Sequence, residues 1–132
     1  MNPNLFVYGT LMSTAGHPMG AKLARESRLI APASIQARLY RVAWYPAAID
    51  SPNAEERVYG ELYALANPLA SLTWLDRYEG LRDGAEASEY VRVERIARPL
   101  GTAEITAWVY LYQAVPDPLQ LIADGRWAAA GK

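Results

Sequence analysis

The sequence contains no cysteine and a single histidine, His17, among its 132 residues. Without cysteine there is no disulfide framework, no thiolate nucleophile and no cysteine-based metal site. A His-rich metal site is excluded as well, and a Ser-His-Asp triad would have to use His17. No partner motif surrounds His17, which we expect in a loop, so a hydrolase that uses Ser13 or Thr14 with His17 is a remote alternative.

Long hydrophobic runs and an excess of either charge are also lacking. No stretch approaches the ~20 apolar residues that span a bilayer, and residues 1–4 show no sign of a signal peptide. The formal net charge is −1, which argues against nucleic acid or an anionic membrane as a partner. Hydrophobic residues make up 52% of the chain. We therefore expect one globular, cytoplasmic domain over residues 1–132, with room for one sizeable core; nothing indicates its oligomeric state.

The stretch Leu-Phe-Val-Tyr-Gly-Thr-Leu at residues 5–11 is the first strong pattern. Its first four residues are apolar or aromatic and predict a short buried strand. Gly9 ends that strand and lets the backbone bend and another molecule come close. The amides of Thr10 and Leu11 then lie outside a ladder and form a small anion-binding concavity. An ordinary turn is the alternative, and the turn residues taken alone favour it.

Alternating apolar and polar residues predict most of the remaining elements. Strands are expected over four ranges, namely 34–42, 58–65, 90–96 and 105–112. Small and larger residues alternate in 58–65, which suits the tight interior of a small barrel. Residues 44–49 are expected as an edge or irregular strand because Pro46 donates no hydrogen bond. An amphipathic helix is expected over 19–29, a helical turn over 119–123, and a loop over 81–89.

The most informative helix lies between Asn67 and Gly80. Asn67 suits the N-terminal cap, Pro68 the first turn, and Gly80 the C-terminal cap. Four residues at spacings of three, three and four are expected on the face that packs against the protein: Leu69, Leu72, Leu75 and Glu79. Asp76 and Arg77 are expected to point elsewhere.

Glu79 is the candidate for chemistry on this helix. A carboxylate on an apolar face is unfavourable unless it is paired or used. Desolvation would raise its pKa toward that of a working general base. The alternative is structural, with Glu79 hydrogen-bonded to a tyrosine or to backbone amides of the last turn. The spacing alone leaves these two interpretations even.

Seven short segments carry a resemblance that spans nearly the whole chain. They are Phe-Val-Tyr-Gly-Thr-Leu at 6–11, Tyr-Pro-Ala-Ala-Ile at 45–49, Val-Tyr-Gly-Glu-Leu-Tyr at 58–63, Leu-Asp-Arg-Tyr-Glu-Gly at 75–80, Glu-Tyr-Val-Arg at 89–92, Ala-Trp-Val-Tyr at 107–110 and Gly-Arg-Trp at 125–127. In these segments and in their order, the chain resembles the gamma-glutamylcyclotransferase-like family, in particular its short members related to gamma-glutamylamine cyclotransferase and the avirulence-induced plant proteins. The resemblance implies an α+β fold, a small mixed β-barrel with helices packed against it.

The resemblance also implies a reaction and a site. The chain would convert a γ-glutamyl amine or peptide to 5-oxoproline and free amine, as a lyase or transferase without metal or cofactor. Glu79 would be the catalytic general acid and base. The residues implied to hold the substrate are Tyr8, Gly9, Thr10, Leu11 and, more weakly, Tyr110. The expected partner is a small γ-glutamyl substrate, with no nucleic acid and no membrane.

Two other classes of function stay open. One is a small-ligand-binding domain on the same fold that has lost turnover, against which the intact Glu79 argues. The other is a partner-binding domain, which a missing cavity between Gly9 and Glu79 would favour. The leaving amine is not indicated by the sequence and could be an amino acid, a polyamine, a protein lysine or a pathway intermediate.

Overall fold

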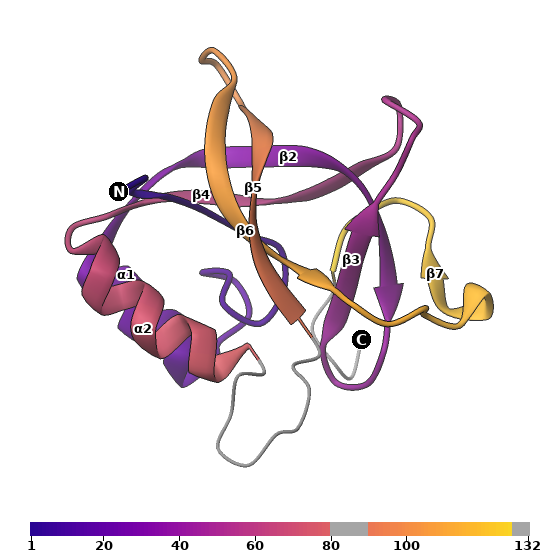
Figure 1. Ribbon diagram of the computed structural model, residues 1–132, viewed down its shortest axis with the longest axis horizontal. Helices are drawn as coiled ribbons and strands as arrows, with labels where there is room; N and C mark the ends of the chain where they lie inside the picture. The colour runs from indigo at the N-terminus through magenta and orange to yellow at the C-terminus, as the bar shows by residue number, and fades with distance from the viewer. Residues whose placement is uncertain (80–89, 128–132) are drawn as a thin grey trace.

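The computed structural model describes residues 1–79 and 90–127 and confirms an α+β fold (Figure 1). The strands are β1 (Asn4–Val7), β2 (Ser27–Arg41), β3 (Pro46–Asp50), β4 (Arg57–Leu65), β5 (Tyr90–Pro99), β6 (Ile105–Tyr112) and β7 (Leu121–Ile122). The helices are α1 (Pro18–Glu26), α2 (Pro68–Tyr78) and the short 3-10 helix η1 (Pro118–Gln120). No helix in these two ranges is long and apolar enough to cross a membrane.

Five strands close into the predicted small barrel. Their order is β2-β4-β1-β6-β5, and β5 returns to β2 where Ile35 pairs with Ala97. The β1–β6 pair is parallel and the other pairs of the circuit are antiparallel, so the barrel is mixed. Because the barrel is closed, none of these five strands has an open edge where it is paired with its neighbours.

The second half of β2 leaves the barrel and pairs with β3 and β7 (Figure 1). β3 begins at Pro46 and has β2 as its one partner strand among the described residues, so the predicted edge strand is confirmed. The predicted helical turn over 119–123 is partly wrong. A 3-10 turn ends at Gln120, and the next two residues pair with Leu39 and Tyr40 of β2 because the ladder satisfies their backbone groups.

The sheet separates two hydrophobic cores. Phe6 and Tyr8 point into the barrel, whereas Leu5 and Val7 point into the layer beneath the helices. β1 lies between β4 and β6 and is therefore buried on both faces. This explains why its sequence is continuously apolar rather than alternating.

The barrel interior is as tight as the small residues of β4 predict. Val58 and Leu62 are fully buried there, with Gly60 between them. A Cβ on Gly60 would lie 2.0 Å from the Val7 carbonyl oxygen and 3.0 Å from Cζ of Phe6. β1 and β4 therefore approach each other at a point where only glycine fits.

The helix α1 is shorter than the sequence predicts. It ends at Glu26 rather than near residue 29, because the chain from Ser27 onward pairs with β4. Long-range ladder bonds thus override the local helical pattern. His17 lies before the helix as expected, and its Nδ1 accepts a hydrogen bond from the Met19 amide at 3.0 Å, which caps α1.

The helix α2 begins as predicted, with the Asn67 side chain accepting a hydrogen bond from the Ala70 amide. Leu72 and Leu75 are buried, but Leu69 is 68% exposed, so its predicted place on the packed face is wrong. A spacing of three residues falls about 60° short of a full helical turn, which rotates Leu69 about 120° away from Leu75. The predicted cap Gly80 and the predicted loop 81–89 lie outside the described residues.

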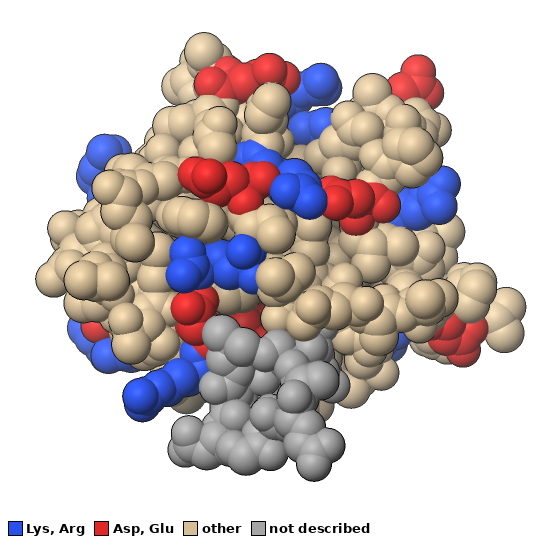
Figure 2. Space-filling view, in the orientation of Figure 1, with Lys and Arg blue, Asp and Glu red and all other residues tan. Residues whose placement is uncertain are grey.

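The face over β5 and β6 carries charges of both signs side by side (Figure 2). Arg95 pairs with Asp50, and Arg98 pairs with Glu104. On the described part of this face, neither sign forms a large patch of the kind that binds a polyanion.

Candidate functional site

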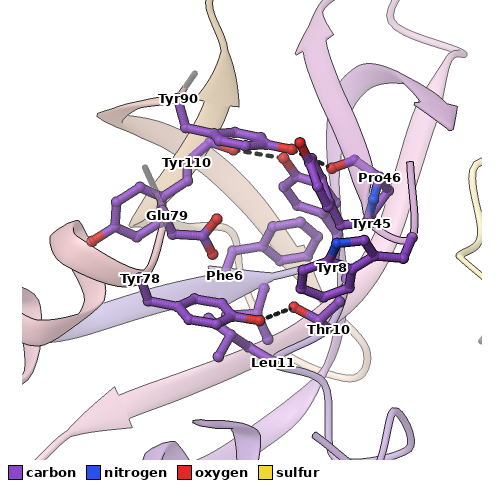
Figure 3. Close-up of a pocket in the computed structure, with 13 residues that line it drawn as sticks. Phe6, Tyr8, Thr10, Leu11, Tyr45, Pro46, Tyr78, Glu79, Tyr90 and Tyr110 are labelled. Atoms are coloured by element: carbon purple, nitrogen blue, oxygen red, sulfur yellow. Dashed lines mark hydrogen bonds between the residues drawn. The ribbon is translucent and has the colours of Figure 1, made fainter. Parts of the chain in front are cut away.

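One pocket brings together all six site residues implied by the sequence. It lies where β1 ends, against the start of β3, the C-terminal end of α2, the start of β5 and the middle of β6 (Figure 3). Its lining includes Tyr8, Gly9, Thr10, Leu11, Glu79 and Tyr110. Segments that are about 70 and 100 residues from β1 in sequence thus meet at one place.

The turn after β1 leaves two backbone amides available. The Met12 amide donates to the Gly9 carbonyl at 3.0 Å and closes the turn. Within the described part of the chain, the amides of Thr10 and Leu11 donate no hydrogen bond. Two neighbouring N–H groups without a protein partner are the usual basis of a small anion site.

Gly9 excludes a side chain because its backbone lies close to Pro46. A Cβ at this position would lie 2.8 Å from Cγ and 2.9 Å from Cδ of Pro46. Its φ is not positive, so the reason for glycine here is close packing rather than a left-handed conformation. Pro46 is itself part of the pocket wall, and its carbonyl accepts a hydrogen bond from the Tyr90 hydroxyl at 2.7 Å.

Two side chains hold the loop that follows Gly9. The Ser13 amide and hydroxyl both donate to the Glu61 carboxylate, at 2.7 and 2.5 Å. The hydroxyls of Thr10 and Tyr78 share a hydrogen bond of 2.5 Å at the pocket (Figure 3). The sequence did not point to Glu61 or Tyr78 individually, although both lie within the segments that carry the family resemblance.

The Tyr8 hydroxyl is committed to the fold. It donates to the Tyr110 carbonyl at 2.7 Å and accepts from the Ala48 amide at 3.2 Å. Burial, together with the negative charge of Glu79, raises the pKa of Tyr8 well above its ordinary value. Tyr8 therefore presents its ring and backbone to the pocket, while its hydroxyl joins β6 to β3.

Glu79 is the residue after α2, where its amide donates to the Leu75 carbonyl at 2.9 Å. Its half-buried carboxylate points into the pocket toward Phe6 (Figure 3). Burial is the largest cause of the raised pKa of Tyr8 and of Tyr110, and the negative charge of Glu79 adds to it in both. Among the described residues that line the pocket, Glu79 is the only one with a carboxylate.

Tyr110 contributes the face of its ring, with its hydroxyl directed away from Tyr8 and Thr10 (Figure 3). The hydroxyl donates to Oδ1 of Asp76 at 2.6 Å, and Asp76 is also paired with Arg92. The prediction that Asp76 points away from the packed face is wrong, because its carboxylate bonds to side chains of β5 and β6 and is only 22% exposed. A partner on another strand cannot be identified from helical spacing alone.

The remaining wall is aromatic and was not predicted residue by residue. It includes Trp44, Tyr45 and Tyr90, with ring centroids 5.1 Å apart for the first pair and 6.2 Å for the second. Tyr45 and Tyr90 each belong to a segment that carries the family resemblance, and this was the signal that could have pointed to them. Aromatic walls exclude water and strengthen electrostatic interactions inside a site.

The residues of the hydrolase alternative do not meet at this pocket. The Ser13 hydroxyl is bound to Glu61, and His17 caps α1. The His17 ring stacks on Trp44 and meets Tyr78 edge-on. Neither Ser13, Thr14 nor His17 is among the described lining residues. Within residues 1–79 and 90–127, no group of three or more His, Cys, Asp or Glu side chains is arranged to hold a metal ion.

Comparisons with known proteins agree with this arrangement. Residues 5–129 match the sequence model of the family described as "Gamma-glutamyl cyclotransferase, AIG2-like". The "Gamma-glutamylcyclotransferase family protein YtfP" of Escherichia coli (strain K12) is 34% identical over 124 residues, which cover 93% of this chain and 94% of that protein.

Two solved structures share the fold. An AIG2-like protein from Mus musculus superposes with a TM-score of 0.73 at 20% identity, covering 98% of this chain and 90% of that one. YkqA from Bacillus subtilis superposes with a TM-score of 0.69 at 23% identity, covering 96% of this chain but only 40% of that one. At these identities the likeness establishes the architecture, a closed barrel with two helices.

Proposed function

Since the chain belongs to the AIG2-like gamma-glutamyl cyclotransferase family, we propose that it converts a γ-glutamyl amine or peptide to 5-oxoproline and the free amine. One observation carries the proposal. Glu79, the only carboxylate among the described lining residues, shares a pocket with a turn whose Thr10 and Leu11 amides have no hydrogen-bond acceptor in the described chain. The cytoplasmic location expected from the sequence is part of the same proposal.

The substrate's α-carboxylate binds to the amides of Thr10 and Leu11, where two N–H groups neutralise its charge. The α-ammonium then lies toward Glu79, which attracts it and accepts its proton. The rings of Tyr8 and Tyr110 flank the glutamyl chain and limit its conformations. This orientation brings the amine to its own γ-carbonyl.

The reaction is an intramolecular aminolysis. Glu79 removes a proton from the α-ammonium, and the resulting amine forms a bond to the γ-carbonyl carbon and closes a five-membered ring. Protonated Glu79 gives its proton to the leaving nitrogen as the old C–N bond breaks. The ring nitrogen loses a second proton, which the released amine takes up as its ammonium, so protons balance. Holding the substrate in one conformer supplies much of the rate.

Three matched compounds test the proposal: a γ-glutamyl amide, its N-acetyl derivative and the α-glutamyl amide of the same amine. Only the first carries a free amine that can form a five-membered ring by attacking the amide carbonyl and so release the amine. We expect 5-oxoproline from it and no reaction of the other two. Release of amine from the N-acetyl compound contradicts the mechanism, and release of glutamate in place of 5-oxoproline identifies a hydrolase.

The alternative of a ligand-binding domain without turnover predicts a different result in the same experiment. Such a domain binds the γ-glutamyl compound, measured by calorimetry, and releases no product over long incubation. Binding without product therefore favours this alternative over the cyclotransferase.

A further inference from the structure

We propose that Asp76 and Arg92 form a positioning pair that fixes Glu79 and the Tyr110 ring relative to each other in the pocket. The effect of this pair on catalysis, though not its geometry, rests on the proposed function. Neither residue of the pair is among the described lining residues. The pair therefore acts on the pocket indirectly, through the helix and strands that it connects.

The pair has the geometry of a fixed contact rather than a surface ion pair. Arg92 donates from Nε to Oδ1 of Asp76 at 2.8 Å and from Nη2 to Oδ2 at 3.2 Å. The side chains are only 23% and 22% exposed, less than those of the other ion pairs in the described chain. The Arg92 guanidinium also stacks 4.5 Å from the Trp108 ring centroid. Two parallel hydrogen bonds and a stacked guanidinium restrict both side chains to one arrangement.

Asp76 extends this contact to Tyr110. The Tyr110 hydroxyl donates to Oδ1 of Asp76 at 2.6 Å, and the Tyr110 carbonyl accepts from Tyr8 at 2.7 Å. Burial first, and then the Asp76 carboxylate, raises the pKa of Tyr110 above its ordinary value, so the hydroxyl stays protonated as a donor. A chain of hydrogen bonds thus joins β5, α2, β6 and the residue that follows β1 around the pocket.

Asp76 also lies three residues before Glu79, in the last turn of α2. The last turn of a helix lacks a following turn to hold its carbonyls and frays most readily. The bonds from Asp76 to β5 and β6 tie this turn to the barrel wall. The direction in which the Glu79 carboxylate enters the pocket therefore depends on a residue that does not touch the substrate.

The test compares Asp76→Asn with Asp50→Asn. Asp50 also forms two hydrogen bonds with Arg95, at 2.9 and 2.7 Å, but this pair is more exposed and is bonded to none of the described pocket residues. Asp76→Asn leaves the Arg92 charge uncompensated near the pocket and loosens the last turn of α2. We expect kcat for 5-oxoproline release to fall about 10- to 100-fold with a smaller change in KM, whereas Asp50→Asn matches the unchanged protein.

A second readout separates positioning from general stability and requires no turnover. The pKa of the Glu79 carboxyl group is measured by NMR in the unchanged protein and in both variants. Loss of the Asp76 charge lowers that pKa, and the acid limb of kcat/KM shifts to lower pH with it, whereas Asp50→Asn moves neither. If Asp76→Asn does not fold, two other variants test the same contacts separately. Arg92→Lys alters the bonds between residue 92 and Asp76, and Tyr110→Phe removes the bond from the Tyr110 hydroxyl to Asp76.

The outcomes distinguish this inference from the proposed function. If the unchanged protein makes no 5-oxoproline but the Glu79 pKa also shifts in Arg92→Lys or Tyr110→Phe, which keep the Asp76 charge, the positioning pair stands and the proposed function fails. If the protein is active and Asp76→Asn, or its two substitutes, keep the original kcat and Glu79 pKa, the pair is only structural and the inference is overturned.

Discussion

The barrel interior and the neighbouring pocket are built from the same strands in opposite ways. The interior is filled with fully buried apolar side chains such as Ile35, Val58 and Leu62, with backbones close enough to require glycine at position 60. The pocket is lined with tyrosines whose hydroxyls bond to other parts of the fold, as those of Tyr8 and Tyr110 do. The difference predicts that substitutions in the interior act on stability, whereas substitutions in the pocket act on the proposed reaction.

The largest expected effect falls on chemistry alone. Glu79→Gln keeps the shape of the side chain but cannot accept and return a proton, so the rate of 5-oxoproline release should fall ~10²–10⁴-fold. The melting temperature should change little, because α2 is held by Leu72 and Leu75 beneath it. A folded Glu79→Gln protein that keeps most of its rate would show that another group is the base.

The next effect falls on stability alone. Leu62 is fully buried in the barrel, so Leu62→Ala should lower the free energy of unfolding by about 2–5 kcal/mol, as measured in urea. The activity of the folded fraction should remain close to the original. Leu69→Ala is the matched control on an exposed leucine and should cost far less. Equal losses in the two variants would mean that Leu62 does not fill a packed interior.

Gly9 lies at the boundary of the two regions and should affect both. In Gly9→Val the added side chain meets Pro46, which forms part of the pocket wall. We expect a stability loss of about 1–3 kcal/mol together with a higher KM for the γ-glutamyl substrate. Unchanged melting temperature and KM together would identify the turn as an ordinary one.

The smallest effect concerns the contact between the two helices. Glu26 accepts hydrogen bonds from Trp74 and Ser71 and pairs with Lys22, which lowers its pKa from 4.5 to about 2, with the Trp74 bond as the largest cause. Because the folded-state pKa is the lower one, Glu26 contributes stability above pH 4.5 that is lost as the pH falls toward 2. Urea unfolding across this window should show a weaker pH dependence in Glu26→Gln, and its activity at neutral pH should be retained. The same pH dependence in both proteins would contradict this assignment.

Much of the fold is predictable from local patterns. Alternation predicted β4, β5, β6 and the second half of β2, and Asn67 with Pro68 predicted the start of α2. The first half of β2 and the short β7 were not predicted. The end of α1 was not predictable, because pairing of Ser27 with Leu65 replaces a local helical pattern with a distant ladder. Leu69 was misplaced because repeated spacings of three drift around a helix.

Less of the candidate site could be predicted from sequence patterns alone. The spacing in α2 singled out Glu79 and left its role open, and the resemblance named the other residues that now line one pocket. Their roles in binding and catalysis stay predictions. The ion pair of Asp76 with Arg92, and the hydrogen bond from the Tyr8 hydroxyl to the Tyr110 carbonyl, join separate elements. Such pairings follow from the closed barrel and have no signature in one sequence.

The central claim is that the substrate's own amine, and not water, attacks the γ-carbonyl under the control of Glu79. Turnover of a γ-glutamyl amide in heavy-oxygen water, followed by mass spectrometry of the acid product, tests it most directly. The account predicts unlabelled 5-oxoproline from the unchanged protein and almost none from Glu79→Gln. Glutamate carrying solvent oxygen as the first product would contradict it.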